Sequence, residues 1–376
     1  SQPLERLRSI ISQTDPRVIL SSASKQGLGA QLTKAPNLVV DQHSISTMHI
    51  TTEPLPTVDP SSKLYVVFTS GTTGVPKGVI ITHSNFSSAI RHQQKAHGFK
   101  STSRIYDFAS YAFDVSWSNF IHALTIGACL CIPSDEDRRD DLAGSLERFG
   151  ATHVDMTPSA ASLLPEKSFK RLETVVLGGE KLSVESAQRW SSLVSLKNPY
   201  GPSECTPTAT IATVTPTDEY KSSIGRGLGL NTWIVNTVTD SLVPVGGVGE
   251  LLLEGPLVGA GYLGDDTKTA ASFVQDPQFL LQICPQGQAR HTRMYKTGDL
   301  VHYNPDGSLS FVGRKDAQVK IHGQRVELTE IESHIRRTSK TIQVAVLFTK
   351  SGLCANRVVH LSASRELAKL RQPPIK

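Results

Sequence analysis

Cysteine pairs with the spacing of metal sites are missing from this sequence of 376 residues. Of the five cysteines, Cys129 and Cys131 alternate along an apolar run, as they would on a core strand. We therefore expect reduced thiols without structural disulfides, as is usual for a cytoplasmic protein.

Long apolar runs are missing too. The longest, 120–133, is shorter than a bilayer-spanning helix and contains His122, and no positively charged leader followed by an apolar run opens the chain. Lysine and arginine number 39 against 34 aspartates and glutamates, without a long block of one sign. The charge pattern therefore predicts no nucleic-acid partner, and the short apolar runs predict no membrane partner. The run 135–141, which is almost entirely charged, is expected to start a solvated helix.

Short apolar runs alternating with amphipathic segments make up most of the chain. This alternation predicts an α/β fold with a largely parallel sheet. Ser84 is placed where an N-cap would start a helix. After about Gly246 glycines multiply and strands shorten, which predicts a small β-rich segment. The expected strands are 18–20, 38–40, 64–69, 129–132, 154–156 and 174–177, and the expected helices are 86–97, 142–149 and 184–192.

The segment YVVFTSGTTGVPKGV, residues 65–79, carries the clearest chemical signal. An apolar strand leads into a loop with glycines, three hydroxyls and Lys77. Glycine lets backbone N–H groups approach an anion, and hydroxyls and an ammonium add donors and charge, so the loop suits a triphosphate. It is not a Walker loop, because Pro76 precedes the lysine and Gly78 follows it. The alternative is a flexible surface turn, which the preceding strand disfavours.

The string TSGTTGVPKG resembles the signature loop of the adenylate-forming superfamily, which includes acyl-CoA synthetases, luciferases and the adenylation domains of nonribosomal peptide synthetases. The resemblance implies that the loop holds the β- and γ-phosphates of ATP and closes over them. It implies a catalytic role for Lys77 and ATP contacts for Ser70, Gly71, Thr72, Thr73, Gly74 and Lys77.

Further motifs follow in the order of that family. NPYGPSE, residues 198–204, resembles its adenine and metal motif, where an aromatic ring can stack on a purine and a carboxylate can hold Mg²⁺. YKTGDL, residues 295–300, resembles the motif whose carboxylate accepts both ribose hydroxyls. Read alone, both segments would be ordinary turns. The resemblance implies Asn198 and Tyr200 at adenine, Ser203 at the Mg²⁺–phosphate end, Glu204 as catalytic residue and metal ligand, and Asp299 and Arg314 as further nucleotide contacts.

GELLLEGPLVGAGYLGD, residues 249–265, and GRKDAQVKIHGQRVELTEIE, residues 313–332, also resemble family segments. The family fold has a large N-terminal lobe of α/β layers with a small β-rich subdomain, followed by a small C-terminal α+β lobe. We expect the large lobe, without its N-terminal part, in residues 1–313, and the truncated start of the small lobe in 314–376. The hinge about which the small lobe rotates is expected at Asp316.

The segment FDVSWSNF, residues 113–120, discriminates between branches of the superfamily. In amino-acid-activating members an aspartate here pairs with the α-ammonium of the substrate, and Asp114 matches it. A buried cation needs a carboxylate partner, whereas fatty and aryl acids have no ammonium. The alternative is a helix-capping aspartate. The string QVKIHGQRVEL is also similar to peptide synthetases, and IPSDEDRRDDL to those of filamentous fungi.

Matching the family's pocket positions onto this chain implies nine substrate contacts. Ser118 and Gly178 are small and leave room for a side chain. Asp155 suggests a polar or cationic side chain, as in ornithine, lysine or a hydroxylated ornithine, although a solvent-facing aspartate at a strand end is the alternative. The nine residues are Asp114, Val115, Ser118, Asp155, Val176, Gly178, Pro199, Pro207 and Thr208.

The resemblance implies a ligase that uses ATP and Mg²⁺ to activate an amino acid as aminoacyl-AMP, releasing pyrophosphate. The aminoacyl group would pass to the phosphopantetheine thiol of a carrier domain, in secondary metabolism such as siderophore biosynthesis, with a condensation domain as neighbour. The family's opening motif does not precede Ser1, and its late lysine motif does not follow Glu332. The chain is therefore expected to bind ATP and amino acid better than it catalyses.

Two alternatives remain open. An acyl- or aryl-CoA ligase of the same superfamily would not need Asp114, and dependence on an amino acid would separate the two. A non-catalytic nucleotide-binding fragment would bind ligands without pyrophosphate exchange. A dehydrogenase is disfavoured, because no dinucleotide fingerprint follows a strand.

Overall fold

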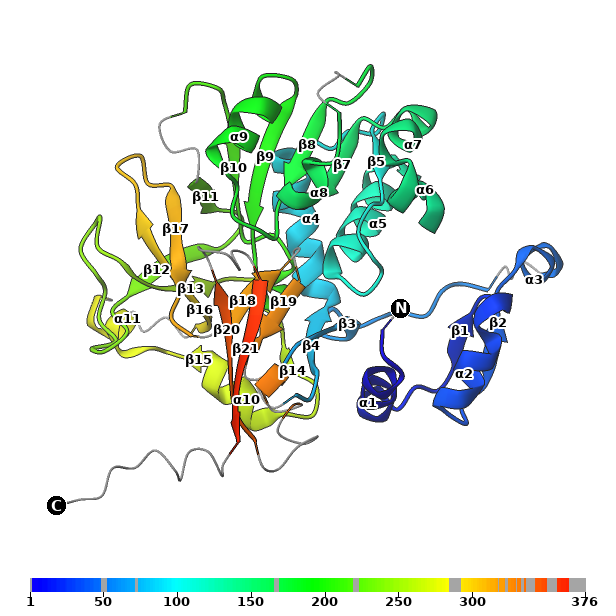
Figure 1. The fold of residues 1–376 in the computed structure, drawn as a ribbon, viewed down its shortest axis with the longest axis horizontal. Helices are drawn as coiled ribbons and strands as arrows, with labels where there is room; N and C mark the ends of the chain where they lie inside the picture. The colour runs from blue at the N-terminus through cyan, green and yellow to red at the C-terminus, as the bar shows by residue number, and fades with distance from the viewer. Residues whose placement is uncertain are drawn as a thin grey trace.

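The computed structural model describes most of the chain (Figure 1). None of the described helices combines the length and apolar character needed to cross a membrane. The described residues are 2–48, 53–71, 74–165, 169–218, 223–283, 292–316, 318–321, 324–328, 330–332, 335, 342–349 and 357–364.

A central sheet of 12 strands organises the molecule. Its parallel half consists of β5 (Arg104–Tyr106), β6 (Cys129–Cys131), β7 (His153–Met156), β8 (Thr174–Leu177) and β9 (Ser195–Tyr200). The connecting helices are α5 (Asp114–Ile126), α6 (Asp135–Asp140), α7 (Leu142–Phe149), α8 (Pro158–Ala161) and α9 (Val184–Ser191). The strands pair in the order β6–β5–β7–β8–β9, and each connection contains at least one helix. The predicted parallel α/β arrangement is therefore observed.

The antiparallel half continues from β9. It consists of β10 (Thr210–Val214), β11 (Ser223–Gly227), β12 (Asn231–Val235), β13 (Gly249–Glu254), β15 (Phe273–Gln275), β16 (Arg293–Tyr303) and β17 (Leu309–Arg314). The order beyond β9 is β10–β11–β17–β16–β13–β12, and β15 pairs with β16. The β-rich segment predicted after Gly246 is present, and most of its strands extend the central sheet.

A separate three-stranded sheet contains β3 (Lys63–Thr69), β4 (Lys77–Thr82) and β14 (Gly261–Tyr262). The helix α4 (His83–His97) follows β4 directly. Its N-cap is Thr82, which forms a capping box with Asn85, so the prediction of Ser84 as N-cap is wrong. The apolar pattern begins only at Phe86, but reciprocal hydrogen bonds between Thr82 and Asn85 start the helix earlier.

The terminal elements form small sheets of their own. At the N-terminal end are α1 (Leu4–Thr14), β1 (Ile19–Ser21), η1 (Ala23–Lys25), α2 (Gln26–Leu32), β2 (Asn37–Val39) and α3 (Gln42–Thr47), and β1 pairs only with β2, to one side of the central sheet in Figure 1. Towards the other end, β18 (Gln318–Ile321) pairs with β19 (Gln324–Glu327), and β20 (Ile342–Thr349) with β21 (Arg357–Ser364). The remaining elements are η2 (Ser203–Cys205), α10 (Asp266–Ser272) and α11 (Gln278–Ile283).

The six predicted strands all occur, each within one residue of its expected bounds. The charged run becomes α6, capped by the Ser134 side chain. Cys129 and Cys131 are free thiols on β6, which is an edge strand, so Cys129 is exposed while Cys131 is buried. The prediction that both lie on a core strand therefore holds only for the second.

The face of the parallel sheet opposite the cavity described below is packed with apolar side chains. Val154 and Met156 of β7 belong to this core together with the fully buried Trp190 of α9. Burying a large apolar side chain contributes about 1.5–3 kcal/mol, so this core fixes the orientation of the strand. Because side chains alternate across a strand, Asp155 is directed to the other face.

Candidate active site

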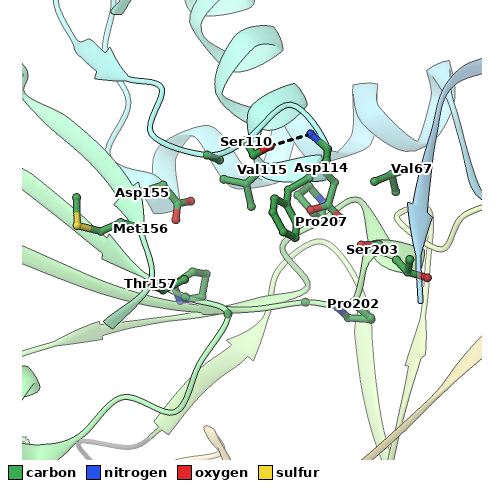
Figure 2. Close-up of a pocket in the computed structure, with 18 of the residues that line it drawn as sticks. Val67, Ser110, Asp114, Val115, Asp155, Met156, Thr157, Pro202, Ser203 and Pro207 are labelled. Carbon is green, nitrogen blue, oxygen red and sulfur yellow. Dashed lines mark hydrogen bonds between the residues drawn. The ribbon is translucent and has the colours of Figure 1, made fainter. Parts of the chain in front are cut away.

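A cavity of about 940 Å³ opens at the carboxyl ends of the parallel strands. Asp155 near the end of β7, residues 178–179 after β8, residues 199–203 at the end of β9, and Asp114 at the start of α5 all line it. Ligands of open parallel sheets bind at this edge. Figure 2 shows Asp114 and Asp155 among the residues that line this cavity, with Val115 drawn between them.

Asp114 is the first residue of α5, whose N-cap is Phe113, so Asp114 does not cap the helix. Its side chain is buried, and Oδ2 has no hydrogen-bond partner among the described residues. Burial raises the pKa of Asp114, and the negative charge of Glu204 raises it further, whereas a hydrogen bond from Ser203 lowers it in part. A buried carboxylate in this environment is stabilised when a cation pairs with it.

Asp155 lies between two core residues of β7. Its side chain is half-buried and lines the cavity, so it does not face solvent on the outer surface. Burial, together with the negative charge of Asp114, raises the pKa of Asp155 to about 7. The described part of the chain supplies its carboxylate with neither a hydrogen bond nor an ion pair. Two carboxylates thus share one cavity without a cation between them.

Seven of the nine predicted pocket residues line the cavity, and the other two do not. Ser118 on α5 and Val176 on β8 are both buried and lie outside the lining. At Gly178 a Cβ would lie 2.9 Å from Cγ of Pro199, so the absence of a side chain there permits close packing of the wall. The lining residues among the nine are Asp114, Val115, Asp155, Gly178, Pro199, Pro207 and Thr208.

A tight loop after β9 carries Pro207 and Thr208 to the cavity. Gly201 is required in it, because a Cβ there would lie 1.9 Å from the carbonyl oxygen of Pro207. Gln93 of α4, which is fully buried, donates from Nε2 to the carbonyls of Thr206 at 2.7 Å and Thr208 at 2.8 Å. Sequence analysis missed this clamp, because one glutamine on a helix belongs to no motif.

The predicted phosphate loop connects β3 to β4, and Ser70 at its start lines the cavity. At Gly71 a Cβ would lie 2.1 Å from a backbone carbonyl oxygen, so only glycine fits. Gly74 has a φ of 78° and donates its N–H to the Gly71 carbonyl at 2.9 Å. Thr72 and Thr73 lie outside the described residues. The glycines therefore shape the loop in which phosphate contacts were predicted.

Lys77 and Glu204, the two predicted catalytic residues, both contact Tyr262. The Lys77 Nζ lies 5.4 Å from the ring centroid of Tyr262, and the tyrosine Oη donates to Oε1 of Glu204 at 2.8 Å. Glu204 is fully buried, and neither Lys77 nor Glu204 lines the cavity. Tyr262 belongs to a motif quoted above, yet sequence analysis gave it no role.

The chemistry of Glu204 and Ser203 fits a hard cation. A carboxylate and a hydroxyl supply the oxygen ligands that Mg²⁺ prefers, and Mg²⁺ commonly takes only one or two protein carboxylates when it arrives with substrate phosphates. The described residues contain no group of three or more potential His, Cys, Asp or Glu ligands. Glu204 and Ser203 are therefore the residues that would hold a Mg²⁺ ion arriving with the phosphates of ATP.

Asp299, the predicted ribose partner, is already held by the protein. Its Oδ2 accepts from Oη of Tyr200 at 2.6 Å, and its Oδ1 accepts from Nη1 of Arg314 at 2.9 Å. Arg314 also donates to both oxygens of Asp316, at 2.9 and 2.6 Å. Tyr200, Asp299 and Arg314 all line the cavity. Because each carboxylate oxygen has two acceptor sites, Asp299 can still receive a ribose diol.

Asn198, predicted to contact adenine, does not line the cavity. It is buried, and its Nδ2 donates to the carbonyl of Ser223 at 2.7 Å, which ties β9 to β11. A role in joining these strands is what its geometry supports.

The helix α1 brackets the phosphate loop from outside. Arg6 donates to the carbonyl of Phe68 at 3.4 Å, and Gln13 donates to the carbonyl of Pro76 at 3.0 Å, so the helix contacts both sides of the loop. Arg6 also lines the cavity. Sequence analysis did not connect α1 with the site, because contacts to backbone carbonyls leave no motif.

A family model described as "AMP-binding enzyme" matches residues 1–263, which include the phosphate loop, Asp114 and Asp155. The chain belongs to the AMP-binding enzyme family.

Relatives and solved structures agree with this membership. Nonribosomal peptide synthetase ungA' of Aspergillus campestris is 49% identical over 345 residues, which cover 90% of this AMP-binding enzyme chain and 4% of that protein. Peramine synthetase A of Epichloe festucae is 46% identical over 347 residues, covering 92% of this chain and 12% of that protein. The structure of holo-PA1221, an NRPS protein containing adenylation and PCP domains, matches with a TM-score of 0.77 and 26% identity, covering 93% of this chain and 60% of that chain.

These findings confirm the predicted resemblance to adenylation domains of nonribosomal peptide synthetases, and the predicted adenylate-forming fold class. Both relatives come from fungi, as the string at residues 132–142 suggested. The chain spans only a small part of the length of these curated relatives. The boundary near Arg314, the hinge and the roles of individual site residues stay predictions.

Proposed function

We propose that this AMP-binding enzyme activates an α-amino acid with ATP to give aminoacyl-AMP and pyrophosphate, which makes it a ligase. The observation that carries the proposal is Asp114, a buried carboxylate with one oxygen unpartnered among the described residues, in the same cavity as Asp299 and Ser70. The α-ammonium of an amino acid would compensate this charge. A fatty or aryl acid would leave it uncompensated, which disfavours the acyl-CoA or aryl-CoA ligase alternative.

In this proposal ATP lies between the phosphate loop and Asp299. The Tyr200 ring offers a stacking face for the adenine, and Asp299 accepts the ribose hydroxyls. Arg314 balances the charge of Asp299, with which it forms an ion pair at 2.9 Å. Lys77 and the loop backbone would reach the phosphates once the nucleotide is bound. Asn198 would support the site through β11 rather than by contact with adenine.

The reaction is a displacement at phosphorus. A carboxylate oxygen of the amino acid attacks the α-phosphorus, and the bond from that phosphorus to the oxygen bridging the β-phosphate breaks. The electron pair leaves with pyrophosphate. Mg²⁺, carried by the phosphates and held by Glu204 and Ser203, would neutralise charge on the phosphoryl oxygens. The protein therefore contributes mainly positioning and electrostatic stabilisation.

The proposed acceptor of the aminoacyl group is the phosphopantetheine thiol of a carrier domain, whose sulfur would displace AMP. Support comes from the names of the relatives, which are peptide synthetases, and from PA1221, which contains adenylation and PCP domains. A neighbouring condensation domain, a cytoplasmic location and a place in secondary metabolism belong to the same proposal. A siderophore as product stays a prediction.

We also propose two lobes, residues 1–313 and 314–376, with the hinge at Asp316. The support is topological: β17 ends at Arg314 within the central sheet, and β18 begins a separate two-stranded sheet. Arg314 pairs with Asp316 across this junction.

Thermal unfolding with non-hydrolysable aminoacyl-adenylate analogues tests the proposal. A ligand present at a hundred times its Kd that binds only the native state stabilises it by about 2.7 kcal/mol. We expect aminoacyl analogues to stabilise the chain and Asp114→Asn to remove the effect. Stabilisation by aryl or fatty-acyl analogues alone would assign the chain to the acyl-ligase branch. Binding without ATP–pyrophosphate exchange would favour a non-catalytic nucleotide-binding fragment.

A further inference from the structure

Asp155 is a carboxylate of the cavity that no part of the proposed reaction uses. If Asp114 holds the α-ammonium and Asp299 the ribose, Asp155 is left in the same cavity with its charge uncompensated (Figure 2). A buried or half-buried polar group that serves the fold is normally hydrogen-bonded by it. Among the described residues no donor bonds to Asp155.

No protein cation among the described residues compensates Asp155 either. The cations that line the cavity there are Arg6 and Arg314. Arg314 is paired with Asp299 and Asp316, and Arg6 donates to a backbone carbonyl beside the phosphate loop. Neither arginine contributes to the pKa of Asp155, which burial and the charge of Asp114 raise to about 7.

The walls near Asp155 suit an aliphatic stem. Val115, Pro199 and Pro207 line the cavity with apolar groups, and Pro199 packs closely against Gly178. A long side chain with a charged end lies well along such a surface, since its methylene groups are buried while its charge reaches a partner.

We infer that Asp155 pairs with a cationic group on the side chain of the substrate, so that the activated amino acid belongs to the ornithine, lysine and arginine class. The inference rests on the proposed function, because it needs the α-ammonium at Asp114. Charge balance supports it: the two carboxylates carry two negative charges, and such an amino acid brings one cation to each. A neutral side chain leaves Asp155 either protonated or uncompensated.

The experiment compares matched analogues that differ in charge but hardly in shape. The arginyl and citrullinyl sulfamoyl-adenosines form one pair, and the lysyl and norleucyl compounds form another. Binding to this chain is measured by calorimetry at pH 8, where Asp155 is mostly ionised. We expect the cationic member of at least one pair to bind at least about thirtyfold more tightly, the loss typical of removing one partner of a buried charge pair.

Variants then assign the preference to Asp155. Asp155→Asn should abolish the preference while binding of the neutral analogue stays the same or improves, and Asp155→Glu should retain part of it. Asp107→Asn is the matched control, because Asp107 is a buried carboxylate with a raised pKa that does not line the cavity. It should leave the ratio within each pair unchanged.

The outcomes separate the inference from the proposed function. Equal binding within both pairs in the unmodified chain overturns the inference and leaves amino-acid activation standing. Failure of every aminoacyl analogue to bind overturns the proposed function itself. A preference for the cation that survives in Asp155→Asn overturns the assignment to Asp155. If Asp155→Asn does not fold, the inference is still tested by the comparison of analogues within each pair and by the Asp155→Glu variant.

Discussion

The carboxylates at the two ends of the cavity differ in whether the protein pairs them with a donor or cation. At the nucleotide end, Asp299 accepts hydrogen bonds from Tyr200 and Arg314 before any ligand arrives. At the substrate end, Asp114 and Asp155 have raised pKa values, and no described cation pairs with either. A paired carboxylate is stable without ligand, whereas an uncompensated one is stabilised only when a cation binds. The nucleotide end is therefore preorganised, and the substrate end is electrostatically incomplete until the amino acid binds.

The largest effect is expected from Asp114→Asn. Removing one partner of a buried ion pair costs about 3–5 kcal/mol, so calorimetry should find the affinity for aminoacyl-adenylate analogues at least about a hundredfold lower. Without ligand the variant should unfold at higher temperature than the unmodified chain, because an uncompensated buried charge has been removed. Asp107→Asn serves as control for the loss of a buried carboxylate elsewhere. An unchanged affinity in Asp114→Asn would show that the two ends do not differ as proposed.

The second effect is a pH dependence of stability from Asp155. Its pKa is raised from 3.8 to about 7, so between these values the folded state keeps a proton that the unfolded chain has lost. The stabilising contribution is complete below about pH 4 and is lost as pH rises through 7, by at most about 4 kcal/mol. The other charged groups that line the cavity are Asp114, whose raised pKa acts in the same direction, Asp299, paired with Arg314, and Arg6 and Glu330.

Denaturant unfolding from pH 4 to pH 8 measures this effect. The stability of Asp155→Asn relative to the unmodified chain should increase with pH across that range. A saturating cationic analogue should cancel the difference in pH dependence, because ion pairing lowers the pKa of the carboxyl group. Parallel stability curves for the variant and the unmodified chain would contradict the raised pKa.

The third effect tests how the substrate end is held in place. Gln93→Leu removes the donor to the Thr206 and Thr208 carbonyls, and leaving buried acceptors unsatisfied costs about 1–3 kcal/mol. We expect a lower melting temperature and weaker binding of the aminoacyl part, with adenosine binding retained. Gln94→Leu, next to it on α4 but with an exposed hydrogen bond, is the matched control. Equal losses for the two variants would contradict a specific clamp.

The smallest effect is expected at the preorganised end. Tyr200→Phe removes one hydrogen bond to Asp299 and should lower the free energy of unfolding by about 1 kcal/mol. Phenylalanine keeps the aromatic ring that is proposed to stack on the adenine, so the affinity for nucleotide should change less than tenfold. Isothermal titration with a non-hydrolysable ATP analogue checks this. If the affinity for nucleotide fell more than a hundredfold, the contact with Arg314 alone would not be enough to hold Asp299 in place, and the nucleotide end would not be preorganised as proposed.

Much of the fold was predictable because its signals are local. Strands such as 174–177 are short apolar runs bounded by polar residues, and α6 follows a capping serine. The start of α4 was mispredicted, because the capping box at Thr82 and Asn85 precedes the apolar periodicity. The separate sheet of β1 and β2 could not be foreseen, since the partner of a strand depends on contacts that are distant in sequence.

The candidate site divides in the same way. Motifs located the phosphate loop, Asp114 and Asp299, because each is a contiguous string with recognisable chemistry. They did not reveal that Lys77 and Glu204 both contact Tyr262.

By itself, the sequence determined the superfamily, the order of its motifs and the residue types available for nucleotide and substrate, because these depend on local strings and on the chemistry of side chains. Only the tertiary structure decided which carboxylates are paired and which are not. The reason is that burial and distance set a pKa, and both arise when β7, β9 and α5 meet at one edge of the sheet. The resemblance named Asp155 as a pocket residue but left a solvent-facing position open, and only the fold shows that it lines the same cavity as Asp114.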